Sequence, residues 1–154
     1  MVTIKVDDLS GPEIAALLEE HIADMRSISP PESKHALDLA GLKKSEITFW
    51  TVWYDGLLAG GGALRQLDAG HGEIKSMRTA RAFRRRGLAA LMLDHIIAEA
   101  RRRGYRRLSL ETGSMDFFEP ARNLYGKFGF EPCGPFAGYR ADPNSAFFTK
   151  VLAP

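Results

Sequence analysis

The spacing of apolar residues predicts strands at three places in the first half of the chain. Residues 2–6, 47–54 and 57–67 combine apolar positions at strand spacing with many β-branched and aromatic side chains. The last two stretches are joined by Asp55-Gly56, a dipeptide typical of tight hairpin turns. Glycines at 60 to 62 interrupt the third stretch, so we expect a bulge or the close approach of another backbone there.

A segment with the apolar spacing of a helix lies between the first two predicted strands. At residues 11–25, Ile14 and Leu17 repeat at the spacing of one buried stripe, which predicts a surface helix. His21 lies in the same stripe, and we interpret it as a packed or rim histidine. The paired prolines that follow cannot continue a helix, so residues 27–33 are predicted to form a loop.

In the second half of the chain, strands alternate with helices. The predicted elements are, in order, a strand at 73–79, a helix at 87–103, a strand at 106–112, a helix at 117–128 and strands at 130–133 and 146–152. The strand, helix, strand order implies a right-handed crossover and parallel pairing of the two strands. Because the other connections suit antiparallel pairing, we expect a mixed sheet in an α/β fold.

Composition and charge exclude several classes of protein. The chain has 154 residues, 45% of them hydrophobic and 26% charged, as in globular domains, so one domain over 1–154 is expected. The formal charge of +2 argues against a nucleic-acid-binding protein that is basic all over. No signal-peptide pattern and no apolar run of the ~18 residues that a membrane span needs is found. Cys133 is the single cysteine, which excludes an internal disulfide, and a cytoplasmic protein that contacts no membrane is expected.

The strand at 73–79 is unusually polar for one that leads into a crossover helix. Burying its charged and hydroxyl side chains without partners would be costly, so part of the strand is expected to face a cleft. The alternative is a half-exposed strand with Glu73 and Lys75 on its solvent face.

The turn between that strand and the next helix contains Arg84, Arg85, Arg86 and Gly87. A strand that feeds such a turn and then a helix leaves backbone N–H groups converging at the positive end of the helix dipole. Arginines beside those groups favour a polyanionic ligand. The turn is therefore a predicted phosphate-binding site.

Two motifs resemble a known family. Residues 84–89 (RRRGLA) fit the R/Q-x-x-G-x-G/A signature of the GNAT superfamily of N-acetyltransferases, between a strand and a helix as in that family. Residues 124–130 (LYGKFGF) resemble its LYxKxGF motif. The resemblance is good over residues 72–130, and it implies a GNAT fold: a central mixed, mostly antiparallel sheet of about six to seven strands flanked by about four helices.

The resemblance also implies acetyl-coenzyme A as the acetyl donor. Backbone amides that would hold its pyrophosphate belong to Arg84, Arg85, Arg86, Gly87, Leu88 and Ala89. Backbone groups that would bind the pantetheine arm and the thioester carbonyl belong to Met77, Arg78 and Thr79. A small residue at positions 87 and 89 keeps the approach of a pyrophosphate open.

Three side chains are candidates for catalysis. Glu73 stands where some members of the family carry a catalytic glutamate that removes a proton from the acceptor amine. Glu111 is the second candidate for that role, or a residue that binds the substrate; a surface or salt-bridging role for Glu73 is the alternative. Tyr125, in the LYxKxGF segment, would protonate the leaving thiolate, although helical tyrosines often only pack.

The resemblance favours direct transfer of an acetyl group to a primary amine of a small molecule. Lys75, Arg78 and Arg140 are available to pair with a carboxylate on that acceptor, which would make it amino-acid-like. The alternative function is an acetyl-coenzyme A sensor with little turnover. No metal is expected because the histidines do not cluster, Cys133 is interpreted as structural, and pairing of edge strands into a homodimer stays open.

Overall fold

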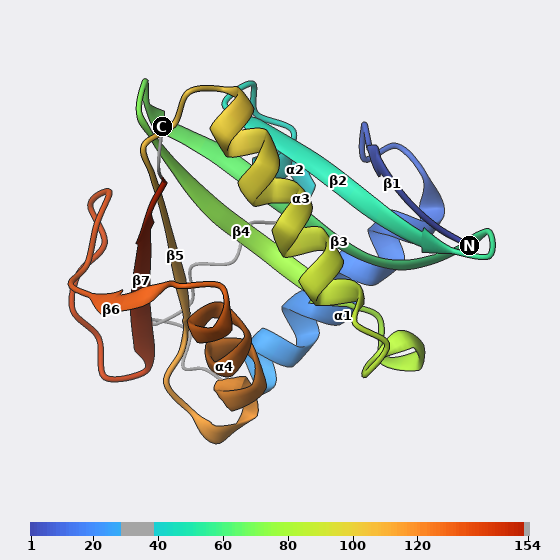
Figure 1. Cartoon of the computed structure of the whole chain (residues 1–154). Coiled ribbons are helices and arrows are strands. Elements are labelled where there is room, and N and C mark those ends of the chain that lie inside the picture. Colours follow the sequence, from blue (N-terminus) through green and yellow to red (C-terminus); the bar gives the residue numbers. More distant parts are fainter. Residues whose placement is uncertain (29–38, 153–154) are drawn as a thin grey trace.

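A single mixed sheet runs through the protein (Figure 1). The computed structural model describes residues 1–28 and 39–152. Within these residues seven strands pair in the order β1-β2-β3-β4-β5-β7-β6. They are β1 (Val2–Val6), β2 (Ile47–Tyr54), β3 (Leu57–Asp68), β4 (His71–Thr79), β5 (Arg107–Gly113), β6 (Glu131–Cys133) and β7 (Ser145–Val151). Strands β4 and β5 are parallel, as the crossover order predicts, and the other described neighbours are antiparallel.

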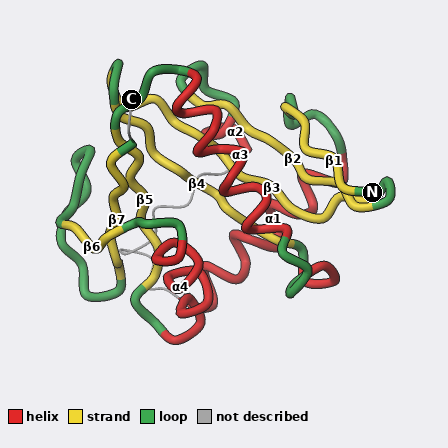
Figure 2. Tube along the Cα trace, in the orientation of Figure 1, coloured by secondary structure: helices red, strands yellow, loops and turns green. Residues whose placement is uncertain are grey.

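Helices cover both faces of this sheet (Figures 1 and 2). Helices α3 (Leu88–Arg102) and α4 (Glu119–Lys127) lie on one face, and α1 (Pro12–Ile28) and the short α2 (Leu39–Leu42) lie on the other. Side chains along β2 point alternately to the two faces of the sheet and so contribute to a hydrophobic core on each face. Trp50 packs in the core beneath α3, and Phe49 packs in the core beneath α1. The GNAT fold expected from the motifs is therefore confirmed in architecture. Across residues 1–28 and 39–152, no helix combines the length and apolarity that crossing a membrane requires.

Several element boundaries differ from the predicted ones. Helix α1 continues to Ile28, so the loop predicted at 27–33 is wrong for its first two residues; residues 29–33 lie outside the described part. The hydroxyl of Ser27 donates to the Asp24 carbonyl at 2.8 Å, a local side-chain bond to the helix backbone.

The predicted helix at 117–128 is divided in two. A 3-10 turn at Asp116–Phe118 precedes α4, which begins at Glu119 with Pro120 in its first turn. Proline is well suited to that position because its missing N–H would have no helical partner there. Strand β4 begins at His71, two residues earlier than predicted, because the preceding turn needs only Ala69 and Gly70.

The glycines of β3 permit both features expected of them. The β3–β4 register shifts between Gly61 and Ala63, where Ser76 and Met77 of β4 lie opposite the single residue Gly62. A Cβ atom on Gly60 would lie 2.5 Å from the Arg78 carbonyl oxygen, so the two backbones approach too closely for a side chain.

Gly60→Ala should therefore destabilise the protein, by about 1 to 3 kcal/mol, because the clash is with backbone that cannot rotate away. Urea denaturation measures the change in the free energy of unfolding. Gly70→Ala is the matched control, since a Cβ atom there would meet its nearest neighbour, the Asp68 carboxylate, at 3.9 Å. Equal stabilities of the two variants would show that β3 and β4 are not packed as described.

Candidate active site

Strands β4 and β5 pair over only part of their length. Their parallel ladder joins His71–Ile74 to Arg107–Leu110 and ends there, although β4 continues to Thr79. The bulge follows at once, with Ser76 at a φ of 55°, in the left-handed region. Beyond Ile74, the edge of β4 that faces β5 has left the ladder, so its backbone groups can bind a ligand.

A cleft of about 140 Å³ opens beside this separation. It brings together the three predicted catalytic residues, Glu73, Glu111 and Tyr125, with Met77 from the predicted coenzyme strand. Its walls also come from α1, through His21 and Met25, and from the start of β7. The other predicted coenzyme residues of β4, Arg78 and Thr79, follow beyond the bulge toward the arginine turn.

The arginine turn has an unusual backbone conformation. Arg84 is extended, Arg85 has a φ of 66°, and Gly87 has a φ of 77° as the N-cap of α3. Gly87 is required by this positive φ and not by space, since a Cβ atom there would meet nothing within 4 Å. In the described chain no side chain caps α3, and its first hydrogen bond runs from Leu91 N–H to the Gly87 carbonyl. The preceding N–H groups, which include those of Leu88 and Ala89, therefore suit a pyrophosphate.

The arginine side chains near this turn differ in what they contact. Arg86 stacks over Tyr54, 5.2 Å from the ring centroid, and over Phe83. Arg102 and Arg103, at the other end of α3, bond to Glu99. Those hydrogen bonds lower the pKa of Glu99 to about 2, and the bond from Arg102 has the largest effect. Part of the local arginine content is therefore structural.

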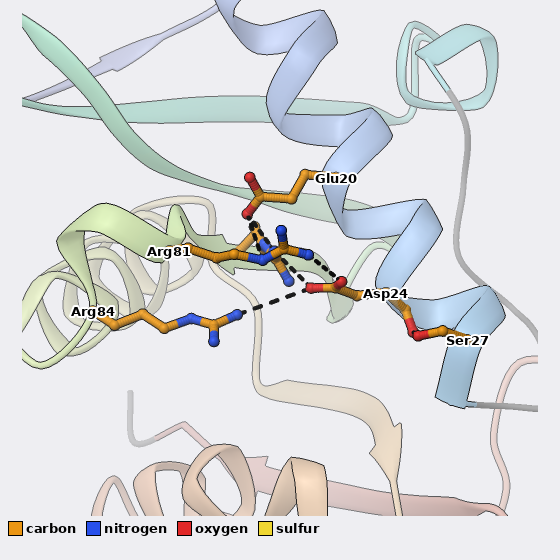
Figure 3. Close-up of polar contacts among 6 residues, drawn as sticks. Glu20, Asp24, Ser27, Arg81 and Arg84 are labelled. Atoms are coloured by element: carbon orange, nitrogen blue, oxygen red, sulfur yellow. Dashed lines mark hydrogen bonds and ion pairs between the residues drawn. The ribbon is translucent and has the colours of Figure 1, made fainter.

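An acidic pair on α1 binds a row of arginines that leads to the turn (Figure 3). Asp24 contacts Arg78 at 2.8 Å, bonds to Arg81 and lies 4.0 Å from Arg84. Glu20, one helical turn away, also binds Arg78, whose side chain is 7% exposed. Burial by itself would raise the pKa of Asp24, but the hydrogen bonds from Arg78 and Arg81 outweigh it and the pKa lies below its ordinary value. We call this group the α1 clamp: Glu20, Asp24, Arg78, Arg81 and Arg84.

The neighbouring face of α1 forms part of the cleft wall. His21 and Met25 line the cleft one residue after each acid of the α1 clamp. Burial, with the positive charge of Arg78, lowers the pKa of His21 to about 4, so its imidazole is neutral at neutral pH. The sequence allowed a packed or rim position for His21 and carried no sign that it lies in one cleft with β4 residues.

Glu73 is deeply buried and paired. It is 1% exposed, and its Oε2 accepts hydrogen bonds from Tyr139 at 2.7 Å and from Lys75 at 3.3 Å. Arg65 approaches its Oε1 at 3.5 Å. The alternative that places Glu73 and Lys75 on a solvent face is therefore wrong. Sequence reasoning missed Tyr139 because the residue comes from the β6–β7 connection, 66 positions away.

Glu111 and Tyr125 face the same cleft from other elements. Glu111 on β5 accepts a hydrogen bond from the Ser145 hydroxyl at 2.7 Å. Tyr125 on α4 is 6% exposed, and burial raises its pKa, so the phenol keeps its proton at neutral pH. A carboxylate and a protonated phenol in one cleft can accept a proton from and donate a proton to groups that react there.

The described residues contain no group of three His, Cys, Asp or Glu side chains that could hold a metal ion. His35 lies outside them. Burial raises the pKa of the half-buried Cys133, which keeps it a thiol and weakens it as a nucleophile.

Asp24→Asn should destabilise the protein by about 2 kcal/mol, because the buried Arg78 loses a charged hydrogen-bond partner. Glu19→Gln is the matched control, since it removes the same charge from an exposed position on α1. Chemical denaturation of both variants measures the difference. A loss in Asp24→Asn no larger than that in the control would show that the α1 clamp contributes nothing to stability.

Comparison with known proteins gives the family. The model of the "Acetyltransferase (GNAT) family" matches residues 14–130. The uncharacterized N-acetyltransferase YsnE of Bacillus subtilis is 58% identical over 97% of this chain and 99% of its own. YedL of Escherichia coli, also an uncharacterized N-acetyltransferase, is 52% identical over 99% of this chain and 96% of its own. A solved structure from Klebsiella pneumoniae shares 26% identity over 99% of both chains, with a TM-score of 0.81. The chain therefore belongs to the GNAT family and is an acetyl-coenzyme A-dependent N-acetyltransferase.

Proposed function

We propose that this enzyme transfers the acetyl group of acetyl-coenzyme A directly to a primary amine of a small molecule. The observation that carries the proposal is the cleft beside the β4–β5 separation, in which Glu73, Glu111 and Tyr125 meet. A thioester that enters between the strands would reach side chains able to accept and to donate a proton. Direct transfer needs no acyl-enzyme, which agrees with the raised pKa of the Cys133 thiol.

The chain has the parts that the donor requires. The N–H groups that begin α3, with Arg85 and Gly87 in the left-handed region, suit the pyrophosphate. The backbone of Met77, Arg78 and Thr79 lies where β4 has left β5 and can bind the pantetheine arm. A backbone N–H directed at the thioester oxygen would stabilise the negative charge that develops there during attack.

The acceptor amine must lose a proton before it attacks, because free amines have pKa values near ~10. Glu73 and Glu111 are the two carboxylates proposed for this step. Oε2 of Glu73 already accepts hydrogen bonds from Tyr139 and Lys75, so Glu73 would have to act through Oε1 or a water molecule. Glu111, on the neighbouring strand, also accepts a hydrogen bond, from the Ser145 hydroxyl, so both carboxylates stay proposed as the base.

The departing thiolate needs a hydrogen-bond donor. Tyr125 supplies one, because burial holds its phenol in the protonated form and the residue lines the cleft. Tyr125→Phe should therefore lower kcat about 100-fold and change the acetyl-coenzyme A Kd by less than about 3-fold. Thiol release with an amine panel and isothermal titration measure the two quantities.

Tyr105→Phe is the control for that variant, since Tyr105 is equally buried in the same core. Unchanged turnover in Tyr125→Phe would remove the residue from the mechanism. Acetyl-coenzyme A binding by the wild type without thiol release for any amine would favour a sensor. No binding by folded protein would end the proposal.

A further inference from the structure

We propose that Lys75 binds a carboxylate of the acceptor, so that the substrates are amino acids or other amines that carry a carboxylate. This inference rests on the proposed function, because it takes the cleft to be the acceptor site. Lys75, which is not proposed to transfer a proton, would then determine which class of amine the enzyme accepts.

Lys75 combines burial with access to the cleft. Its side chain is 7% exposed, and the residue lines the cleft next to Glu73 and Ser76. Its ammonium group contacts Tyr139 at 2.7 Å and Glu73 at 3.3 Å. An ammonium group has three N–H donors, so within the described residues one donor is left for a ligand. A hydrogen bond from a charged donor is stronger to a charged acceptor than to a neutral one, so an anionic group of the acceptor fits this position.

Among the described residues, Lys75 and Arg65 are the two cations that contact Glu73. Glu73 is the carboxylate of this group, and it faces two cations, because Arg65 approaches Oε1 while Lys75 contacts Oε2. Arg65 is more exposed than Lys75, at 36% against 7% for the side chains. Water therefore screens Arg65 better than it screens Lys75. Of the two cations, Lys75 is therefore the one that would act more strongly on a carboxylate in the cleft.

Tyr139 holds Lys75 in place. Burial and the negative charge of Glu73 keep the pKa of this phenol above its ordinary value, so it stays protonated. The phenol donates to Glu73 and therefore accepts from Lys75. Its ring packs against Phe136 and Phe147, which fixes the direction of the hydroxyl. Tyr139 is thus a positioning residue for the Lys75 ammonium.

The other two cations considered from the sequence are placed differently. Arg78 is bound by Glu20 and Asp24 in the α1 clamp, and Arg140 is exposed on the β6–β7 connection. Neither is among the described residues that line the cleft. Lys75 also has a carboxylate neighbour in the cleft, Glu111, on the adjacent strand. An acceptor that carries both an ammonium and a carboxylate complements this pair of opposite charges.

The first experiment compares each common amino acid with the amine that lacks its α-carboxylate, by thiol release from acetyl-coenzyme A. The best carboxylated acceptor should exceed its decarboxylated partner by about 10- to 100-fold in kcat/KM, as expected for a charged hydrogen bond. Equal values would overturn the inference while leaving amine acetylation intact. Failure to bind acetyl-coenzyme A at all would overturn the proposed function as well.

The second experiment assigns the preference to Lys75. In Lys75→Met the ratio between the paired acceptors should fall to within about 3-fold, whereas Lys75→Arg should keep part of it because the charge is retained. Lys44→Met, at an exposed position, should keep the wild-type ratio. Titration of acetyl-coenzyme A into each variant shows that it is folded. A ratio that persists in a folded Lys75→Met protein would overturn the assignment.

A binding measurement separates recognition from chemistry. The N-acetylated amino acid should bind the wild-type complex with coenzyme A more tightly than the N-acetylated amine does, and Lys75→Met should remove that difference. Tyr139→Phe should reduce it without abolishing it, because Lys75 keeps its charge and loses one contact. Equal binding of the two products to the wild type would contradict a carboxylate site at Lys75.

Discussion

The separation of β4 from β5 is the constraint on which the rest of the site depends. A parallel pair in a sheet interior would ordinarily continue and fill the space with ladder hydrogen bonds. Here the ladder stops at Ile74, and the bulge at Ser76 and Met77 turns β4 away while Gly62 lets the extra residue fit. The protein thereby gives up a few strand hydrogen bonds to keep backbone groups available between two strands.

The α1 clamp connects the two ends of this opening. Asp24 and Glu20 hold Arg78 on β4 and reach Arg81 and Arg84 beside the proposed phosphate-binding turn. The same helix presents His21 and Met25 to the cleft. Helix α1 therefore borders both the proposed coenzyme site and the proposed acceptor site. A shift of α1 would change the geometry of both sites. Since Arg78 is buried and Arg84 is half-exposed, the contact with Arg84 is the one that a phosphate could most readily replace.

Local patterns predicted most of the fold. Strand spacing, the Asp55-Gly56 hairpin and the strand, helix, strand order predicted the mixed sheet, and the motif at residues 84–89 predicted the family and led to the proposed coenzyme turn. Those signals lie within a few residues of the features they report. The contacts of Glu73 with Tyr139, and of Asp24 with Arg78, join residues 66 and 54 positions apart in the chain, so no local pattern could reveal them. The position at which the β4–β5 ladder ends could not be predicted from the sequence either, because a bulge with serine in the left-handed region has no strong sequence signature.

A crystal structure of the protein with acetyl-coenzyme A would show whether the coenzyme lies between β4 and β5. We expect the pyrophosphate against the N–H groups that begin α3, near Gly87, and the pantetheine arm between β4 and β5, with the thioester next to Ser76 and Met77. The thioester sulfur should lie within hydrogen-bond reach of the Tyr125 hydroxyl. A coenzyme bound elsewhere on the sheet, or a β4–β5 ladder that closes below the bound arm, would contradict the central claim.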